Sequence, residues 1–324
     1  MGNAFGLIIV RPLGLILLAI FKAVHSYGLA VILFALAVKL VCIPLAVKGK
    51  KSMLAMTALN NELQQLQKTY ANNRVKLNEE MQKLYDKHGV NPMSGCLPQF
   101  IPLPIMMGLY YAVQQPLKFM MGFGDEVISK LATLVGVDTA TAGFYGQITI
   151  AEKLSQMADA AGNFPASVTS ITDGMGELLK IDFNFLGLDL SQIPSIKHPS
   201  ILWIIPLLSG LTAYLSSFIM QRMQGVQNNQ NNQATNTMKS MYIIMPLMSV
   251  YFGFILPGAI GIYWIFNNAF TCVQEVVLTK ILRGKHDKEE AEKAQKEAAA
   301  KEARKEANRA AQQSQGAKKK KGDK

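Results

Sequence analysis

Residues Tyr27–Val47 read YGLAVILFALAVKLVCIPLAV, and Lys39 is the only charged residue among them. About 20 apolar residues in a helix are enough to cross the hydrocarbon core of a bilayer. Four further runs of this kind follow along the chain. We therefore predict an all-α integral membrane protein with a five-span helical bundle. The other four spans are Pro92–Val113, Ser200–Met220, Lys239–Pro257 and Ala259–Ile281.

The basic residues lie mainly on one side of these spans. Segments 48–91, 221–238 and 282–324 hold 23 Lys and Arg, whereas 1–26 and 114–199 hold 7. Loops rich in Lys and Arg remain in the cytoplasm. We therefore expect the amino terminus outside and the carboxyl terminus in the cytoplasm, which agrees with an odd number of spans.

Composition argues against several kinds of site. The chain has 324 residues, half of them hydrophobic, and a formal net charge of +11. Its three cysteines, Cys42, Cys96 and Cys272, fall inside predicted spans and lack the spacing of a disulfide framework or a metal site. The four histidines are scattered. We therefore expect no bound metal and no cofactor.

The first 25 residues are apolar, but Arg11-Pro12 divides them. A helix from Pro12 to Val24 would be only about 19 Å long, too short to cross a bilayer. We expect residues 1–25 to form an amphipathic helix on the outer interface. An additional uncleaved span is the alternative.

Segment 48–91 is polar, with apolar residues at alternating steps of three and four. The pattern breaks at Asn72-Asn73 and then resumes. Two helices joined by a short turn and packed along an apolar seam would give this pattern. We predict a cytoplasmic helical hairpin here, and a polar loop with some helix is the alternative. The seam residues are Leu59, Leu63, Leu66, Leu77, Met81 and Leu84.

The segment between the second and third spans, 114–199, is long and acidic, with nine Asp or Glu against five Lys. Ile128–Val135 and Ile148–Ala158 have the pattern of amphipathic helices. We expect an extracytoplasmic region that forms a small surface cap. No catalytic constellation is evident in it.

Two other segments are expected in the cytoplasm. Residues 221–238 are rich in Asn and Gln, which indicates a flexible linker. The tail, 282–324, is basic, and its part Arg283–Lys324 has a net charge of +6. Lysines bind phosphate groups of RNA or of anionic lipid. We favour ribosome contact over lipid contact for the final basic cluster, Lys318, Lys319, Lys320 and Lys321.

Lys39 is the strongest polar signal in the spans. It lies nine residues before Lys48, which places it about 13 Å from the cytoplasmic end of its helix. A lysine at this depth opposes insertion unless it faces water or a partner. The alternative is snorkelling to the inner interface, although a lysine stem covers only about half of that depth.

Two other spans carry polar residues at helical steps. In the third span they are Ser209, Thr212 and Ser216. The fifth-span stripe comprises Trp264, Asn268, Thr271 and Glu275. Steps of three and four place residues on one side of a helix, and amides are costly to leave in lipid. With Lys39, the stripes predict a hydrated cavity; ordinary helix packing is the alternative. The expected lining comprises Thr212, Ser216, Ser217, Trp264, Asn267, Asn268 and Thr271, and Glu275 ends the fifth-span stripe.

Prolines are concentrated in the second span. Pro98, Pro102 and Pro104 stand within seven residues. Each removes a backbone donor, so this helix is expected to bend or to be mobile. A harmless kink is the alternative, because proline is tolerated in membrane spans.

Four stretches carry a resemblance to a known family. The most specific is residues 81–98, MQKLYDKHGVNPMSGCLP, which join the hairpin to the second span. The others lie within Ser26–Leu45, Pro206–Leu215 and Met245–Asn268. In this order the chain closely resembles the YidC/Oxa/Alb membrane protein insertases. Residues from about 122 to 183 have no recognisable counterpart in that family.

The resemblance implies a groove between the spans, open to the cytoplasm and to lipid and closed outside. Lys39 stands where the family usually has arginine, so the positive charge is kept but the planar fork is lost. Nascent segments would leave the groove along the second and fourth spans. The residues implied in this substrate slide are Cys96, Leu97, Pro98, Pro104, Met245 and Pro246.

The resemblance also implies partners and a location. Nascent membrane proteins and the lipid bilayer are the expected partners, with the ribosome reached through the basic tail and the Sec translocon as a further candidate. No enzymatic step and no small-molecule substrate are expected. The short form without a large periplasmic domain indicates the plasma membrane of a single-membrane bacterium.

Two other functions fit the intramembrane polar groups less well. A small-solute transporter or channel is the main alternative, but the inverted repeats and paired broken helices of transporters are not evident. An intramembrane enzyme would need a marked nucleophile to pair with Lys39. Glu275 is the only carboxylate in any predicted span, so we regard an enzyme as the weakest reading.

Overall fold

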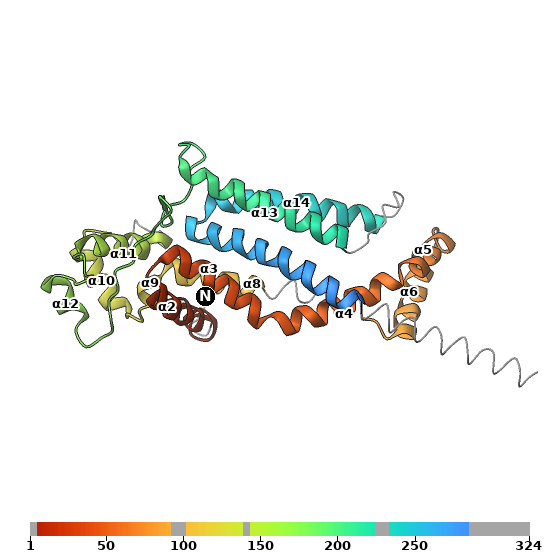
Figure 1. Ribbon diagram of the computed structural model, residues 1–324, viewed down its shortest axis with the longest axis horizontal. Helices are drawn as coiled ribbons and strands as arrows, with labels where there is room; N and C mark the ends of the chain where they lie inside the picture. Colours follow the sequence, from red (N-terminus) through yellow and green to blue (C-terminus); the bar gives the residue numbers. More distant parts are fainter. Residues whose placement is uncertain (1–4, 92–101, 139–142, 224–232, 285–324) are drawn as a thin grey trace, which may run out of the picture. The chain divides into compact units, whose positions relative to one another are not determined.

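The computed structural model describes residues 5–91, 102–138, 143–223 and 233–284. These residues are mostly helical. The chain divides into two compact units, Met1–Val276 and Val277–Lys324. The described part of the second unit, 277–284, is helical. The contacts given below all lie within the first unit, whose elements are labelled in Figure 1.

The amino-terminal segment is one continuous helix. A π-helical turn, η1 (Gly6–Val10), runs directly into α2 (Arg11–Val24). The break expected at Arg11-Pro12 is absent: a π-helical turn precedes Pro12, with the Arg11 N–H donating to the Gly6 carbonyl, and this altered hydrogen-bond pattern lets the helix continue through the proline. Gly6–Val24 is therefore long and apolar enough to cross a membrane. Its placement on the outer interface stays a prediction.

The first predicted span is a helix with a sharp bend. Helices α3 (Tyr27–Val41) and α4 (Ile43–Ala58) meet at an angle of 56°. Pro44 lies at the start of α4 and cannot donate to the carbonyl one turn earlier, so the ladder breaks near Cys42. Helix α4 then extends beyond the predicted span end at Val47.

A helical hairpin follows, made of α5 (Asn60–Thr69) and α6 (Arg74–His88). The Asn73 side chain accepts a hydrogen bond from the Lys76 N–H at 3.1 Å and so caps α6. Gly89, with φ of 62°, ends it. Leu77 is half-buried and lies outside the apolar cluster of the hairpin. That cluster comprises Leu59, Leu63, Leu66, Met81, Leu84, Tyr85 and Val90.

The second predicted span is described only in its later part, α8 (Pro102–Gln114), which is followed by the short α9 (Pro116–Phe119). Helix α8 packs against η1 and α2. The close approach is made at Gly108, where a Cβ atom would meet the side chains of Leu13 and Ile9.

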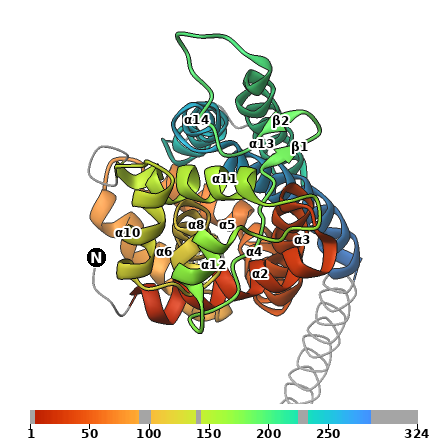
Figure 2. The same cartoon turned by 90° about the vertical axis from the view of Figure 1, so that its left-hand side faces the viewer.

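The outer region contains α10 (Asp125–Leu134), the 3₁₀ turn η2 (Gly143–Tyr145), α11 (Gly146–Met157) and α12 (Ala166–Thr172). A two-stranded antiparallel hairpin, β1 (Asn184–Phe185) and β2 (Leu188–Asp189), follows. Figure 2 views this region face on. Its side chains join one hydrophobic cluster with those of α3. The Phe183 ring, for example, meets the Tyr27 ring edge-on at 4.9 Å.

The remaining elements are η3 (Ile201–Trp203), α13 (Ile204–Met223), α14 (Gln233–Ile255) and a helix over 258–284. Helices α13 and α14 lie side by side and antiparallel (Figure 1). Glycines allow this packing, since a Cβ atom at Gly253 would lie 2.7 Å from the Pro206 Cα atom. The backbone N–H groups of Gly258 and Ala259 donate to the carbonyls of Gln192 and Leu190, which fixes the start of the 258–284 helix.

Length and composition identify candidate membrane spans within the described residues. Gly6–Val24 and Ile201–Met223 each suffice alone, and the bent pair α3–α4 makes a third. Ile243–Ile255 is apolar but shorter. The protein is thus mostly helical with two or three such spans by this measure, fewer than the five predicted, partly because 92–101 lie outside the described residues.

Candidate functional site: a polar seam between α3, α4 and the 258–284 helix

Lys39 lies on α3, three residues before the bend. Its Nζ atom donates a hydrogen bond to Thr271 Oγ1 at 2.8 Å. The Thr271 hydroxyl donates in turn to the Asn267 carbonyl oxygen, one helical turn earlier, at 2.6 Å. Lys39 and Thr271 are both half-buried. The structure therefore brings the predicted groove cation into contact with the fifth-span stripe.

A second cation meets the same helix one turn further along. Lys50 of α4 forms an ion pair with Glu275, with 2.5 Å between Nζ and Oε2. The Lys50 side chain is 2% exposed and that of Glu275 is 19% exposed. A paired charge of this kind is sheltered from water. The bend at Cys42 thus leaves α3 and α4 each contributing one lysine to one helix.

The fifth-span stripe also reaches α14. The Trp264 Nε1–H group donates to Ser249 Oγ at 3.1 Å, and Ser249 donates to the Met245 carbonyl at 3.0 Å. Asn268 Nδ2 is buried and has no hydrogen-bond partner among the described residues. A buried amide without a partner is costly in an apolar bundle, so water is the natural partner for it.

The predicted third-span residues behave differently. Thr212 Oγ1 donates to the carbonyls of Leu208 and Ser209 in its own helix. Ser216 and Ser217 are half-buried. In the part of the chain that the structure describes, no hydrogen bond joins these three residues to Lys39. The helix-packing alternative therefore remains open for the third-span stripe.

The predicted slide residues are only partly described. Pro104 on α8 and Met245 on α14 are exposed, whereas Pro246 is buried. Cys96, Leu97 and Pro98 lie outside the described residues, as do the tail lysines Lys318, Lys319, Lys320 and Lys321. Helices α13 and α14 also present exposed apolar side chains: Leu207, Leu211, Leu215, Ile243, Ile244, Leu247 and Tyr251.

Two residues of the seam were missed by sequence reasoning. Lys50 was grouped with the polar hairpin segment, and nothing in the basic run Lys48–Lys51 distinguishes it. Ser249 is one of two serines in the predicted fourth span, which makes it a weak signal in the sequence. Only the fold shows that one pairs with Glu275 and the other with Trp264.

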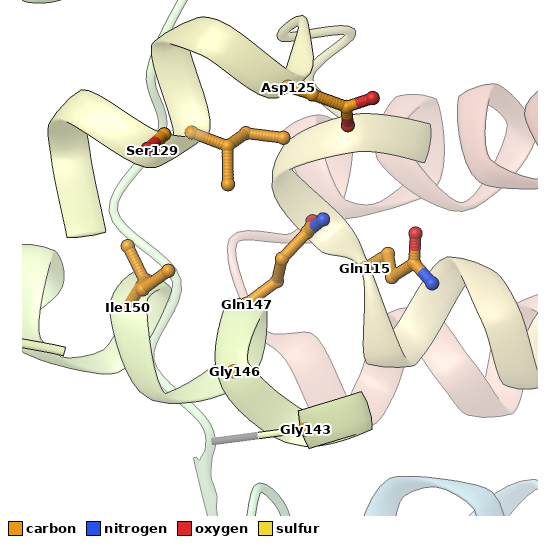
Figure 3. Close-up of a pocket in the computed structure, with 8 residues that line it drawn as sticks. Gln115, Asp125, Ser129, Gly143, Gly146, Gln147 and Ile150 are labelled. Atoms are coloured by element: carbon orange, nitrogen blue, oxygen red, sulfur yellow. The ribbon is translucent and has the colours of Figure 1, made fainter. Parts of the chain in front are cut away.

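A separate cavity of about 310 Å³ lies in the outer region (Figure 3). Asp125 on its wall is paired with Lys118, at 2.6 Å. The Gln147 side-chain oxygen accepts a hydrogen bond from the Lys118 backbone N–H at 3.2 Å. Because these two polar groups already have partners within the protein, we assign the cavity no part in the site.

The outer region is held to the spans by polar contacts as well. The Tyr145 hydroxyl donates to the Ile255 carbonyl, at the end of α14, at 3.3 Å. Burial raises the pKa of Tyr145 to about 12, so the hydroxyl keeps its proton at neutral pH. Burial, reinforced by the charge of Asp189, also raises the pKa of the Glu152 carboxyl. The contact at Ile255 ties the region to the carboxyl end of α14.

Comparison with known proteins identifies the family. A family model described as "60Kd inner membrane protein" matches residues 19–287. That match includes α3, the hairpin, α13, α14 and every residue of the polar seam. The chain belongs to the YidC/Oxa/Alb family of membrane protein insertases.

Individual family members are similar over most of this chain. The "Membrane protein insertase YidC" of Alkalihalophilus pseudofirmus is 28% identical over 273 residues, covering 82% of this chain and 78% of the relative. That of Clostridium perfringens is 26% identical over 294 residues, covering 87% and 95%. The "ALBINO3-like protein 1, chloroplastic" of Arabidopsis thaliana is 29% identical over 264 residues, covering 79% of this chain but 44% of the relative.

Proposed function

We propose that this chain inserts nascent hydrophobic segments into the bilayer through a hydrated, positively charged groove. The observation that carries the proposal is the Lys39 amine, which is hydrogen-bonded to Thr271 between two apolar helices. A lysine in that position lowers the barrier for a substrate's polar end, since the end exchanges water for a polar, cationic surface instead of lipid.

The proposed architecture has five spans, with the amino terminus outside and the carboxyl terminus in the cytoplasm. The asymmetric distribution of Lys and Arg supports this orientation. Helices α3, α8, α13, α14 and 258–284 would be the spans, and Phe5–Val24 the interfacial helix. The proposed location is the plasma membrane of a bacterium, in line with the bacterial relatives.

The mechanism needs electrostatics and hydrophobic transfer alone. Acidic residues in the outer tail of a substrate are attracted to Lys39, which draws the tail into the groove. The apolar substrate segment then moves past exposed side chains such as Met245 of α14 into lipid. Burial of that segment, worth roughly 25 cal/mol per Å² of apolar surface, drives its release. No nucleotide and no covalent step are required.

The hairpin and the tail are proposed contacts for other partners. The hairpin has its own apolar cluster, which includes Leu63 and Leu84, so its two helices can pack together without the polar seam. The basic residues of the tail favour contact with the ribosome, and the Sec translocon is a further candidate partner. The residues assigned to the groove, such as Lys39 and Thr271, all precede the tail in the sequence.

Reconstitution tests the proposal. The purified chain in liposomes should protect a single-span substrate with an acidic outer tail from added protease. We expect Lys39→Arg to retain most of this insertion, Lys39→Ala to weaken it, and Lys39→Glu to lower it several-fold because the charge is reversed.

Two results would count against the proposal. Equal protection in liposomes that lack the protein would exclude insertase activity. Normal insertion by Lys39→Glu would show that the electrostatic part of the mechanism is wrong. A substrate whose tail carries no acidic residue is the control, because its insertion should respond little to the Lys39 variants.

A further inference from the structure

The ion pair between Lys50 and Glu275 is shielded from solvent, although most residues of α4 are half-buried or exposed. Its atoms are 2.5 Å apart, and the lysine side chain is 2% exposed. The pair joins α4, just beyond the bend of the first span, to the 258–284 helix. Both partners belong to the first compact unit.

Stability alone gives little reason for this pair. Burying two charges requires stripping water from both, and replacing such a pair with apolar residues of similar volume is often neutral or stabilising. Two apolar residues would therefore hold α4 against the helix as well. The charges themselves are the feature that calls for a function.

Glu275 also stands next to the groove cation. It lies four residues after Thr271, the hydrogen-bond partner of Lys39, so the two positions share one face of the helix. Because Thr271 contacts Lys39, a negative charge one helical turn away also lies near the Lys39 amine. The carboxylate of Glu275 is thus placed to act on two lysines, one through direct contact and one through its field.

We propose that Glu275 is a specificity-determining residue that sets the positive potential of the groove. This inference rests on the proposed function. Glu275 neutralises Lys50 and attenuates the field of Lys39, so the groove attracts acidic substrate tails only moderately. Lys50 in turn holds the carboxylate, which would otherwise be drawn towards Lys39 and compete with the substrate for it.

This arrangement predicts changes of opposite sign. Glu275→Gln removes the counter-charge, so the ratio of acidic-tail to neutral-tail substrate insertion should rise. Lys50→Met frees the carboxylate to pair with Lys39, so the same ratio should fall. Changing both residues to Met removes a neutral pair and should leave the ratio near that of the wild type.

The experiment uses the full-length protein in liposomes. Two versions of one single-span substrate are compared, with four Asp or with four Asn in the outer tail. The readout is the ratio of acidic-tail to neutral-tail insertion, which cancels differences in the amount of active protein. We expect this ratio to rise about threefold for Glu275→Gln and to fall about threefold for Lys50→Met. A change of one unit charge at a partly buried site alters the attraction of an acidic tail by an amount of this order.

The outcomes separate the possibilities. If the ion pair were only structural, each single variant would lower the insertion of both substrates together and leave the ratio unchanged. That result would overturn the inference. Absence of insertion by the wild type would refute the proposed function itself. If Glu275→Gln does not accumulate in membranes, the fall for Lys50→Met and its reversal in the double variant still decide the question.

Discussion

At the scale of single residues, Gly253 is a position where α14 packs directly against the backbone of α13. A Cβ atom there would lie 2.7 Å from Pro206 Cα and 2.8 Å from Pro206 Cβ. Contacts this short force one helix to move, because the Pro206 backbone cannot rotate away. The position therefore needs a residue without a side chain.

We predict that Gly253→Ala lowers stability by about 1–3 kcal/mol, the usual range for overpacking a close contact. The sign is informative, because Ala in place of Gly normally stabilises a helix by about 1 kcal/mol. Thermal unfolding in detergent measures the change. Leu247→Ala on the same helix is the control, since Leu247 is 64% exposed; equal stability of Gly253→Ala and the wild type would contradict the close packing.

Sequence reasoning found several polar residues of the seam but not their partners. Lys39, Thr271 and Glu275 stand out as polar groups in apolar runs, because such groups in a membrane span need water or a polar partner. Their partners depend on how the helices cross. Lys50 in particular looks like one more cytoplasmic lysine until the fold buries it against Glu275.

At the scale of helices, the described parts of the predicted spans and of the hairpin are helical, although some ends differ and their placement in a membrane stays a prediction. Apolar periodicity located the hairpin helices and the helices of the outer region. It did not show that α4 continues to Ala58, because a polar surface helix and a loop have similar compositions. It also predicts a break at Pro12, although the helix continues through this residue after a π-helical turn.

The polar stripes predict water inside the bundle. Cysteines at Thr212, Ser216 and Asn268, introduced singly into a cysteine-free background, should react with a water-soluble maleimide added from the cytoplasmic side. The reason to expect this is that Asn268 lies one turn before Thr271, the partner of Lys39. Labelling rates in intact membrane vesicles of known orientation measure the access of water to each position.

Matched controls lie on the same helices. Leu211 on α13 and Val273 on the 258–284 helix are exposed apolar residues, 53% and 62% exposed, and their cysteine variants should face lipid and react slowly. Reaction at Asn268 with protection at Thr212 and Ser216 would restrict the water to the seam beside Lys39. Protection at all three test positions would mean that the stripes serve helix packing.

At the scale of the whole molecule, the outer region was the least predictable part. Sequence reasoning recognises no family counterpart for residues 122–183, although the family match extends across them. Short amphipathic helices also do not reveal what their apolar faces meet. The structure shows that Leu131 and Leu154 share one hydrophobic cluster with Phe34 of α3. The region is thus packed as part of the same core as the spans, which follows from long-range contacts that local sequence patterns do not encode.

The charge distribution of the whole chain leads to the last prediction. Residues Arg283–Lys324 carry a net charge of +6 and end in four adjacent lysines, Lys318–Lys321. The segment contains no aromatic residue. Lysines without stacking side chains favour contact with phosphate groups over recognition of bases. Binding of this kind releases counterions and weakens steeply as salt rises.

We predict that ending the chain at Gly284 lowers its co-sedimentation with ribosomes at low salt. The full-length protein should lose the same association as the salt concentration rises, because phosphate contacts are screened. Membrane residence and insertion of simple substrates should be retained, since the polar seam of Lys39, Thr271, Lys50 and Glu275 lies before the truncation. Replacing Lys318–Lys321 with Gln in the full chain separates the lysine cluster from the rest of the tail. Salt-resistant ribosome binding by the truncated chain would indicate that the hairpin of α5 and α6 makes the contact. If truncation left ribosome binding unchanged but abolished binding to vesicles of anionic lipid, lipid would be the partner of the tail.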